Sequence, residues 1–215
     1  MSKSNSFLKL AFIVAVFFSV RFSDVSAQSC PTSIAPTNIS WIGPNFGSVQ
    51  IPGTNCWIDF HSCYQTVNSV TEYYISDWGP NPTNWGSECS SINWADMLNI
   101  VRKKLFKGTG KPPCSGSGSG TQTVRIFSGT CLSFTSGSYP TAFSCAGEQF
   151  CKTECTLCDA GGGNTTESNC STSVVGSSNS CSTLTDFSSL NFGAVLNNTW
   201  GYSYSTCYFV DCTNY

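Results

Sequence analysis

The sequence contains few charged residues and a single histidine. Of its 215 residues, 10 are Lys or Arg and 12 are Asp or Glu, which gives a net charge of −2 at pH 7. A protein that binds nucleic acid through phosphate groups needs a clear excess of basic residues, so this composition argues against nucleic acid as a partner. One histidine, His61, also leaves little material for acid–base catalysis.

The motifs of common catalytic and metal sites are absent. There is no G-x-S-x-G nucleophile elbow, no phosphate-binding glycine loop, no H-E-x-x-H pair and no D-x-D-x-D calcium loop. Asp59 and His61 could form an orienting pair, but no nucleophile accompanies them, and solvated residues on the outer face of a strand explain both equally well. We therefore predict no catalytic residue, no cofactor and no metal. Enzyme activity stays open, with a non-enzymatic role favoured.

Only one long hydrophobic run occurs, and it lies near the start of the chain. The segment from Leu10 to Val20 is apolar except for Ser19, two lysines precede it, and small residues around position 27 offer a cleavage site. This layout predicts a secretory signal peptide over residues 1–27, which is too short to cross a bilayer as a helix. We expect a secreted, extracellular or cell-surface protein without a transmembrane segment in the mature chain.

Cysteine, by contrast, is abundant. All fourteen cysteines follow the predicted cleavage site, and an even number in an exported chain indicates disulfides, here up to seven. Each bridge adds about 2–4 kcal/mol, chiefly by restricting the unfolded chain. The spacing does not reveal which pairs form. We predict that all of these cysteines are bridged: Cys30, Cys56, Cys63, Cys89, Cys114, Cys131, Cys145, Cys151, Cys155, Cys158, Cys170, Cys181, Cys207 and Cys212.

The segment CKTECTLCDAGGG, residues 151–163, has the C-x3-C-x2-C spacing with which radical-SAM enzymes hold an iron–sulfur cluster. We interpret its three cysteines as disulfide partners instead. An oxidising compartment disfavours cluster assembly, and the chain after Cys158 is too short for the repeated αβ units of such enzymes. Structural zinc lacks a second ligand pair at a suitable spacing, and the C-x-x-C of Cys155 and Cys158 lacks the βαβ pattern of a thiol oxidoreductase.

Alternation of apolar and polar residues predicts several strands. In residues 56–67, Ile58 and Phe60 share one face, while Asp59 and His61 share the other. On such a strand Cys56 and Cys63 lie too far apart to pair with each other. Residues 72–78 are the expected antiparallel partner, residues 123–134 form another alternating segment, and short extended pieces are expected at 39–42 and 48–51.

One amphipathic helix is predicted over residues 93–108. Asn93 is placed to cap it, Gly108 follows its end, and its apolar stripe consists of Trp94, Met97, Leu98, Val101 and Leu105. Five cations lie on the helix or just beyond it: Arg102, Lys103, Lys104, Lys107 and Lys111. They fit a docking surface for an anionic polymer or membrane, or simply solubility and a favourable interaction with the helix dipole. We favour the second interpretation.

These elements predict an α+β, mainly β fold: a small disulfide-rich domain with an antiparallel sheet and one amphipathic helix. Residues 28–158 are expected to form this domain. Residues 159–183 are small and polar and are expected to be a Gly/Ser/Thr/Asn-rich loop or linker, which a Cys170–Cys181 bridge would restrain. Residues 184–215 are expected to be a C-terminal β segment packed on the main domain or completing it.

The C-terminal segment NTWGYSYSTCYFVDC alternates aromatic and small residues. In an extended strand Trp200, Tyr202, Tyr204 and Tyr208 share one face. Exposed rings could stack on sugars, whereas buried rings, the commoner arrangement, would form the core face of a sheet. A long terminal strand could also extend the sheet of a neighbouring subunit.

Four N-x-S/T sequons occur, at Asn38, Asn164, Asn169 and Asn197. If the chain is exported through the endoplasmic reticulum, they are candidate glycan sites. In a bacterium they would carry little meaning.

The function predicted from these features is that of a secreted, disulfide-stabilised, non-enzymatic extracellular or cell-envelope protein with a structural, adhesive or assembly role. The prediction rests on the export signal, the heavy cross-linking and the lack of a catalytic constellation. The alternative is a carbohydrate-binding module that uses Trp200, Tyr202, Tyr204 and Tyr208, and a secreted hydrolase ranks third. The expected partners are further copies of the chain, other surface proteins or a polysaccharide.

Overall fold

The computed structural model describes residues 30–31, 34, 40–108, 110–145, 149–177, 181–183, 187–199, 201, 203–204 and 206–212. The predicted signal peptide at 1–27 lies outside the described residues, as do Asn38, Trp200 and Tyr202. Among the helices of the described part, none has the length and apolar character needed to cross a membrane.

The predicted fold class is confirmed, because strands dominate and helices are few. In chain order the elements are β1 (Ile42–Gln50), β2 (Trp57–Val67), β3 (Val70–Pro80), η1 (Ser87–Ser91), α2 (Trp94–Phe106), β4 (Gln122–Gly129), β5 (Cys131–Phe134), β6 (Ala142–Ser144), β7 (Gln149–Gly161), β8 (Asn164–Gly176), β9 (Ser182–Thr183), α3 (Phe192–Leu196) and β10 (Tyr208–Phe209).

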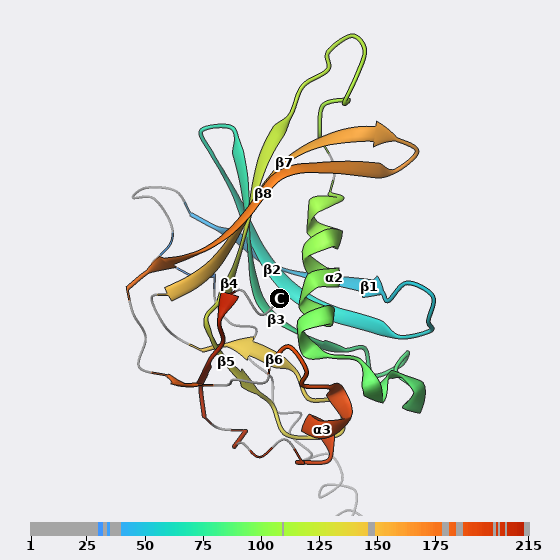
Figure 1. Cartoon of the computed structure of the whole chain (residues 1–215), viewed down its shortest axis with the longest axis vertical. Coiled ribbons are helices and arrows are strands. Elements are labelled where there is room, and N and C mark those ends of the chain that lie inside the picture. The colour runs from blue at the N-terminus through green and yellow to red at the C-terminus, as the bar shows by residue number, and fades with distance from the viewer. Residues whose placement is uncertain are drawn as a thin grey trace, which may run out of the picture.

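The strands form one branched sheet, with the order β8-β7-β4-β3-β6-β5-β10-β9 and with β2 and then β1 on the other side of β3. Most pairs are antiparallel, including the predicted β2–β3 pair. The pairing of β3 with β4 is parallel, because the connection through α2 returns the chain to the same end of the sheet. Figure 1 shows α2 beside the strongly twisted strands.

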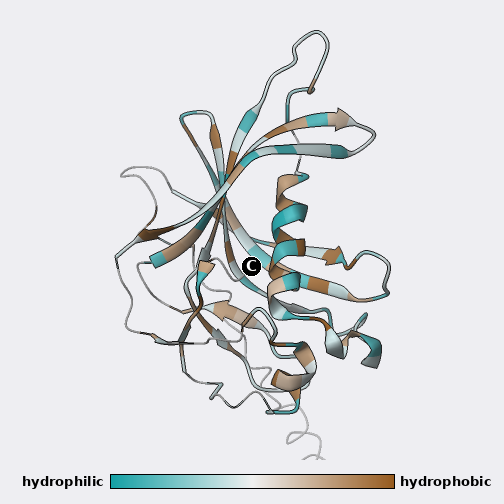
Figure 2. Cartoon of the chain, viewed as in Figure 1, coloured by the Kyte–Doolittle hydropathy of each residue, from teal (hydrophilic) through white to brown (hydrophobic). Residues whose placement is uncertain are grey.

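The main core lies between α2 and the sheet. Among the helix residues that are 0% exposed are Trp94, Met97, Leu98 and Val101. They belong to the same apolar cluster as the sheet residues Ile58, Ile75, Val124, Ile126 and Leu157. Burying each such side chain contributes about 1.5–3 kcal/mol. Figure 2 shows hydrophobic and hydrophilic residues along α2, as expected of a helix with one buried side.

The predicted helix is confirmed, but its predicted cap is realised only in part. Asn93 stands at the N-cap position with extended backbone angles, yet its side chain makes no capping hydrogen bond. Instead, the backbone of Asn93 forms a bridge with Asn191, which precedes α3. Contacts with a distant part of the chain therefore fix the start of α2 in place of the local cap.

A second, smaller apolar cluster covers the opposite face of the sheet. It consists of Cys63, Tyr74, Phe127 and Phe150, with Cys30, Ile34, Trp41 and Val175 packed against them. The ring of Trp41 meets Tyr74 and Phe127 edge to face, and the Cys30–Cys63 disulfide ties the N-terminal segment to β2. The middle of the sheet is thus buried on both faces, which explains why apolar residues occur on both sides of β3 and β4.

The prediction that every cysteine is bridged is confirmed. The seven disulfides are Cys30–Cys63, Cys56–Cys89, Cys114–Cys158, Cys131–Cys181, Cys145–Cys207, Cys151–Cys212 and Cys155–Cys170. The three cysteines of the C-x3-C-x2-C segment lie on β7 and bridge to three different parts of the chain. The suggested Cys170–Cys181 pair is wrong, since each partner bridges elsewhere. Seven disulfides are consistent with an oxidising, extracellular environment.

The expected loop at 159–183 differs from the structure. β7 continues to Gly161, and a tight turn leads into the thirteen-residue strand β8. Three successive glycines, at 161–163, have φ values of 84°, 63° and 79°, which residues with a side chain rarely adopt. β8 is exposed along nearly its whole length. A strand without a buried face needs no apolar alternation, so its polar composition resembled that of a loop.

The C-terminal segment also differs from the strand predicted from its alternation. Among the described residues of this segment, strand structure occurs at Tyr208–Phe209, and the short helix α3 precedes it. The side chain of Asn191 caps α3 by accepting a hydrogen bond from the amide of Ala194 at 2.8 Å. Asn198 and Gly201 have positive φ values of 54° and 80°, which interrupt an extended strand.

Candidate functional site

A cleft of about 220 Å³ opens on the side of β2 and β3 that faces away from α2. Asp59 and His61 of β2 line it because they alternate with Ile58 and Phe60, which belong to the core beneath α2. Asp77 of β3 lies directly opposite His61 in the register of the sheet. Other lining residues come from three further parts of the chain: Phe46, Pro80, Pro82, Tyr139 and Thr141.

The only histidine of the chain forms a close pair in this cleft. Nδ1 of His61 lies 2.7 Å from Oδ1 of Asp77, and Ser76 Oγ donates a hydrogen bond to Oδ2 of Asp77 at 2.9 Å. A carboxylate beside Nδ1 favours the tautomer with the proton on Nδ1, which leaves Nε2 of the neutral ring as an acceptor. No described residue hydrogen-bonds to Nε2. Nε2 is thus available to a ligand as an acceptor.

The second carboxylate of the cleft is held by the loop that follows β3. Nδ2 of Asn81 donates to both oxygens of Asp59, at 3.0 and 2.9 Å. Oδ1 of the same asparagine accepts from the backbone amides of Thr83 and Asn84 at 3.0 and 2.9 Å. This turn fixes Asn81, and Asn81 in turn fixes Asp59. Each oxygen of Asp59 keeps lone pairs that can accept hydrogen bonds from a ligand.

Two exposed aromatic rings flank these polar groups. The exposed fractions of Phe46 and Tyr139 are 64% and 41%, and the ring of Phe46 meets the ring of His61 edge to face with centroids 5.6 Å apart. The position of Tyr139 depends on Gly79. A Cβ at Gly79 would lie 3.0 Å from the carbonyl oxygen of Pro140 and 3.1 Å from Cα of Thr141. A side chain at Gly79 would therefore require this loop to give way by a few tenths of an ångström.

Sequence reasoning found part of this site. The sequence allows Asp59 and His61 as an orienting pair but favours solvated residues on the outer face of a strand, whereas the structure pairs His61 with Asp77 across the sheet. Asp77 is 6% exposed, so it is not a solvated surface residue. The register of the predicted β2–β3 hairpin could have revealed this contact. Phe46 and Tyr139 lie in Gly- and Ser-rich surroundings that offered no local signal.

The four aromatic residues of the predicted C-terminal platform are described only in part. Trp200 and Tyr202 lie outside the described residues. Tyr204 is half-buried and its hydroxyl donates to the carbonyl oxygen of Val195. Tyr208 is 6% exposed and its hydroxyl accepts from the amide of Ser203 at 2.8 Å. The platform as a whole stays a prediction.

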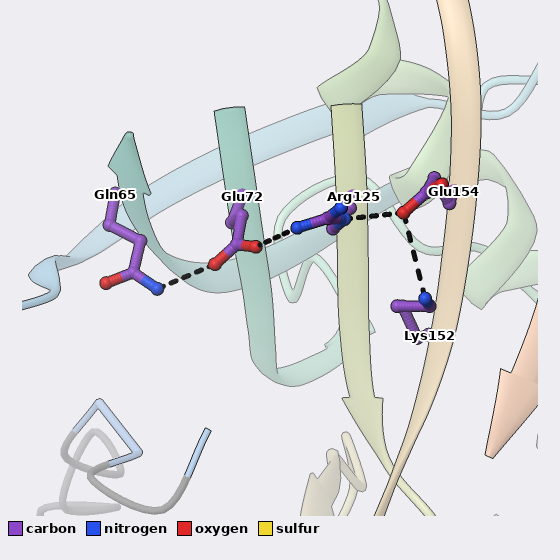
Figure 3. A network of polar contacts seen from close by, with 5 residues as sticks. All are labelled: Gln65, Glu72, Arg125, Lys152 and Glu154. Atoms are coloured by element: carbon purple, nitrogen blue, oxygen red, sulfur yellow. Dashed lines mark hydrogen bonds and ion pairs between the residues drawn. The ribbon is translucent and has the colours of Figure 1, made fainter. Parts of the chain in front are cut away.

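A row of polar side chains crosses the sheet on the same face as the smaller apolar cluster (Figure 3). Gln65 donates to Glu72 at 2.7 Å, and Arg125 donates to Glu72 at 3.0 Å and also to Glu154. Lys152 lies 3.7 Å from Glu154. Arg125 lowers the pKa of Glu154, and the two carboxylates raise the pKa of Arg125, chiefly through hydrogen bonds. Oε1 of Gln65 is buried without a hydrogen-bond partner among the described residues, but the charged groups of the row pair with one another, and we assign the row to stability.

Two groups of side chains have the spacing of metal ligands in the described part of the chain. One is Cys56, Cys89 and Glu88, and the other is Cys155, Cys170 and Glu167. In both groups the two cysteines are joined in a disulfide. A metal is bound by a thiolate, which a disulfide sulfur is not. Neither group has the donors of a metal site.

The cleft is therefore the strongest candidate site among the described residues. It combines two oriented carboxylates, an imidazole nitrogen and two exposed rings in one hollow, which matches the usual pattern of few polar groups in a largely apolar pocket. No protein-family profile, no curated protein and no solved structure matches this chain.

Proposed function

We propose that this protein is an extracellular binding module that holds a saccharide in the cleft between Phe46 and Tyr139. The observation that carries the proposal is that one cleft is lined both by two exposed rings and by two hydrogen-bonded carboxylates. Such a module would serve adhesion to a polysaccharide, one of the roles expected of a secreted, disulfide-stabilised protein. The ligand would lie in this cleft and not on the C-terminal aromatic residues.

A sugar ring presents apolar C–H groups and hydroxyl groups at the same time. Exposed rings such as Phe46 and Tyr139 offer a large apolar surface to the C–H groups of the sugar, and Tyr139 adds a hydroxyl at its tip. The carboxylates accept hydrogen bonds from the sugar hydroxyl groups, and charge-assisted bonds of this kind are about twice as strong as neutral ones. Nε2 of His61 provides one further acceptor. The cleft thus offers mainly acceptors, which is what sugar hydroxyls require.

The charge and size of the cleft restrict the kind of saccharide. Asp59 and Asp77 both face the ligand, and no Lys or Arg lines the cleft. An acidic sugar would be repelled, so the ligand is a neutral one. The volume of about 220 Å³ is below the ~300–1,000 Å³ of typical drug-sized sites. It suits a single sugar ring at the end or edge of a longer chain.

Binding is favoured over hydrolysis by the surroundings of His61. Covalent catalysis assisted by an imidazole needs the hydroxyl or thiol of a nucleophilic side chain within hydrogen-bond reach of the ring. No described hydroxyl bonds to Nε2, and the hydroxyl of Ser76 lies on the other side of Asp77. Both oxygens of Asp59 accept hydrogen bonds from Asn81, so this carboxylate is held in place as an acceptor.

The test is a screen of neutral and acidic glycans on an array, followed by calorimetric titration of the strongest ligand. Asp59→Asn should weaken binding about tenfold or more, since a charge-assisted hydrogen bond contributes about 1.5–3 kcal/mol. Tyr139→Ala should weaken binding to a similar degree, because it removes the apolar surface of an exposed ring. Tyr64→Ala is the matched control, because Tyr64 is an aromatic residue of similar exposure, 39%, that does not line the cleft.

Retained binding in Asp59→Asn and Tyr139→Ala would refute the proposal, as would an array on which only acidic glycans bind. Release of a cleaved product during the titration would show that the protein hydrolyses the glycan, and would also refute the proposal. An equal loss of affinity in Tyr64→Ala would show that the binding site is not the cleft.

A further inference from the structure

A second hollow lies between the end of β1 and the C-terminal half of α2. Its volume is about 290 Å³, and its apolar lining comes from Val49, Pro52 and Ile100. Gln50 and three exposed lysines at the end of α2 complete the lining: Lys103, Lys104 and, at the C-cap, Lys107. We call this hollow the lysine groove. It lies on the helix side of the sheet, whereas the carboxylates of the His61 cleft face the opposite side.

The lysines of the groove have no acidic partner among the described residues. No described carboxylate lies within 4.0 Å of any of the three, in a chain that is acidic overall. Lys103 and Lys107 are four residues apart and so lie on one face of the helix. The helix dipole accounts for cations near the C-terminus of α2, but it does not account for cations gathered around an apolar hollow.

The groove borders a free sheet edge. β1 pairs with β2 and with no other described strand, so the backbone groups along its outer edge have no partner in the sheet. Residues 45–50 pair with β2 in an unbroken register, and β1 contains no charged residue. Charged side chains and Pro are the usual protection of an edge against a further strand. Pro44 lies outside this regular part.

We propose that the lysine groove and the outer edge of β1 together bind an extended, acidic segment of a partner protein. The segment adds to the sheet as a strand beside residues 45–50. Side chains at alternate positions of the added strand point to the helix side. There an apolar side chain enters the hollow over Val49 and Ile100, and acidic side chains two positions before and after it meet the lysines.

Two other anionic partners fit these observations less well. A sulfated polysaccharide would pair with the lysines, but it has no apolar group for the hollow and no backbone for the edge of β1. A membrane surface would need an apolar face of α2 that points outward. The apolar stripe of α2 is instead buried against the sheet, with Trp94, Met97 and Leu98 at 0% exposure.

The experiment uses two capped peptides of identical composition, ETVTE and TEVET, titrated into the ¹⁵N-labelled folded protein. In ETVTE the valine and both glutamates share one face of a strand, whereas in TEVET the glutamates face the other way. We expect ETVTE to bind several-fold more tightly than TEVET, with the largest shifts and the slowest amide exchange at residues 45–50. Equal binding of the two peptides, or shifts elsewhere, would overturn the proposal.

Matched variants then test the lysines. Lys103→Gln with Lys107→Gln should weaken ETVTE binding roughly fivefold, in line with two exposed ion pairs. Lys111→Gln with Lys152→Gln removes the same charge outside the groove and should leave binding unchanged, as should Tyr139→Ala in the cleft. A sulfated polysaccharide or phosphatidylserine vesicles that bind through Lys103 and Lys107, with no binding of ETVTE, would contradict a protein partner.

Discussion

The disulfides Cys145–Cys207 and Cys151–Cys212 are interleaved along the chain, and this has a measurable consequence for stability. Their partners are separated by 62 and 61 residues. Treated alone, each closes a loop that corresponds to about 4 kcal/mol of lost chain entropy in the unfolded state. However, Cys145 lies close to Cys151 in the sequence, and Cys207 lies close to Cys212. Once one is formed, the other closes a loop of only about 12 residues, which corresponds to about 3 kcal/mol.

The two bridges should therefore be non-additive. Replacing either pair of cysteines with alanine should lower the free energy of unfolding by about 3 kcal/mol, and replacing both pairs should lower it by about 7 kcal/mol. The assay is denaturant unfolding without reductant, with the slope m compared between variants as a check on the unfolded state. A double replacement that costs no more than the sum of the single ones would refute the reasoning.

Two further predictions concern the polar row and the wall of the cleft. Arg125 lowers the pKa of Glu154 in the folded protein. The contribution of this carboxylate to the free energy of unfolding is therefore fully present above the ordinary glutamate pKa, about 4.3. It is lost as the pH falls through the lowered pKa of the folded protein. Glu154→Gln should lower the free energy of unfolding by up to about 1 kcal/mol at about pH 7 and have little effect on it at about pH 2; an equal loss at both pH values would contradict this. Gly79→Ala should displace the loop that carries Tyr139, because its Cβ would lie 3.0 Å from a backbone oxygen. It should reduce saccharide binding while the protein stays folded by circular dichroism, and unchanged binding would show that the loop does not depend on Gly79.

Much of the sheet and helix could be predicted from local patterns. β2 alternates because one of its faces is buried, and α2 has a stripe of helical period because one of its sides is buried. β8 was not predicted, because its exposed residues show no alternation of apolar and polar side chains. The C-terminal aromatic residues alternated, but Asn198 and Gly201 turn the chain there, and a pattern of side chains does not report a backbone turn.

The candidate site was harder to predict than the elements that build it. His61 and Asp77 meet through the register of β2 and β3, and a bulge between His61 and Ser62 changes which residues face each other. Tyr139 reaches the cleft from a loop whose position is fixed by contacts with Gly79, far away in the sequence. The disulfide pairs depend in the same way on three-dimensional proximity. Spacing alone showed only that Cys56 and Cys63 could not pair with each other, which is confirmed.

The most direct test of the saccharide proposal is the ¹⁵N resonance of Nε2 in His61, followed while the neutral glycan selected on the array is added. We predict a saturable shift of this resonance with the same affinity that calorimetry measures, and none in Asp59→Asn at the same glycan concentration. A glycan that binds the protein and leaves the His61 resonance unchanged would contradict the account, as would an array without any neutral ligand.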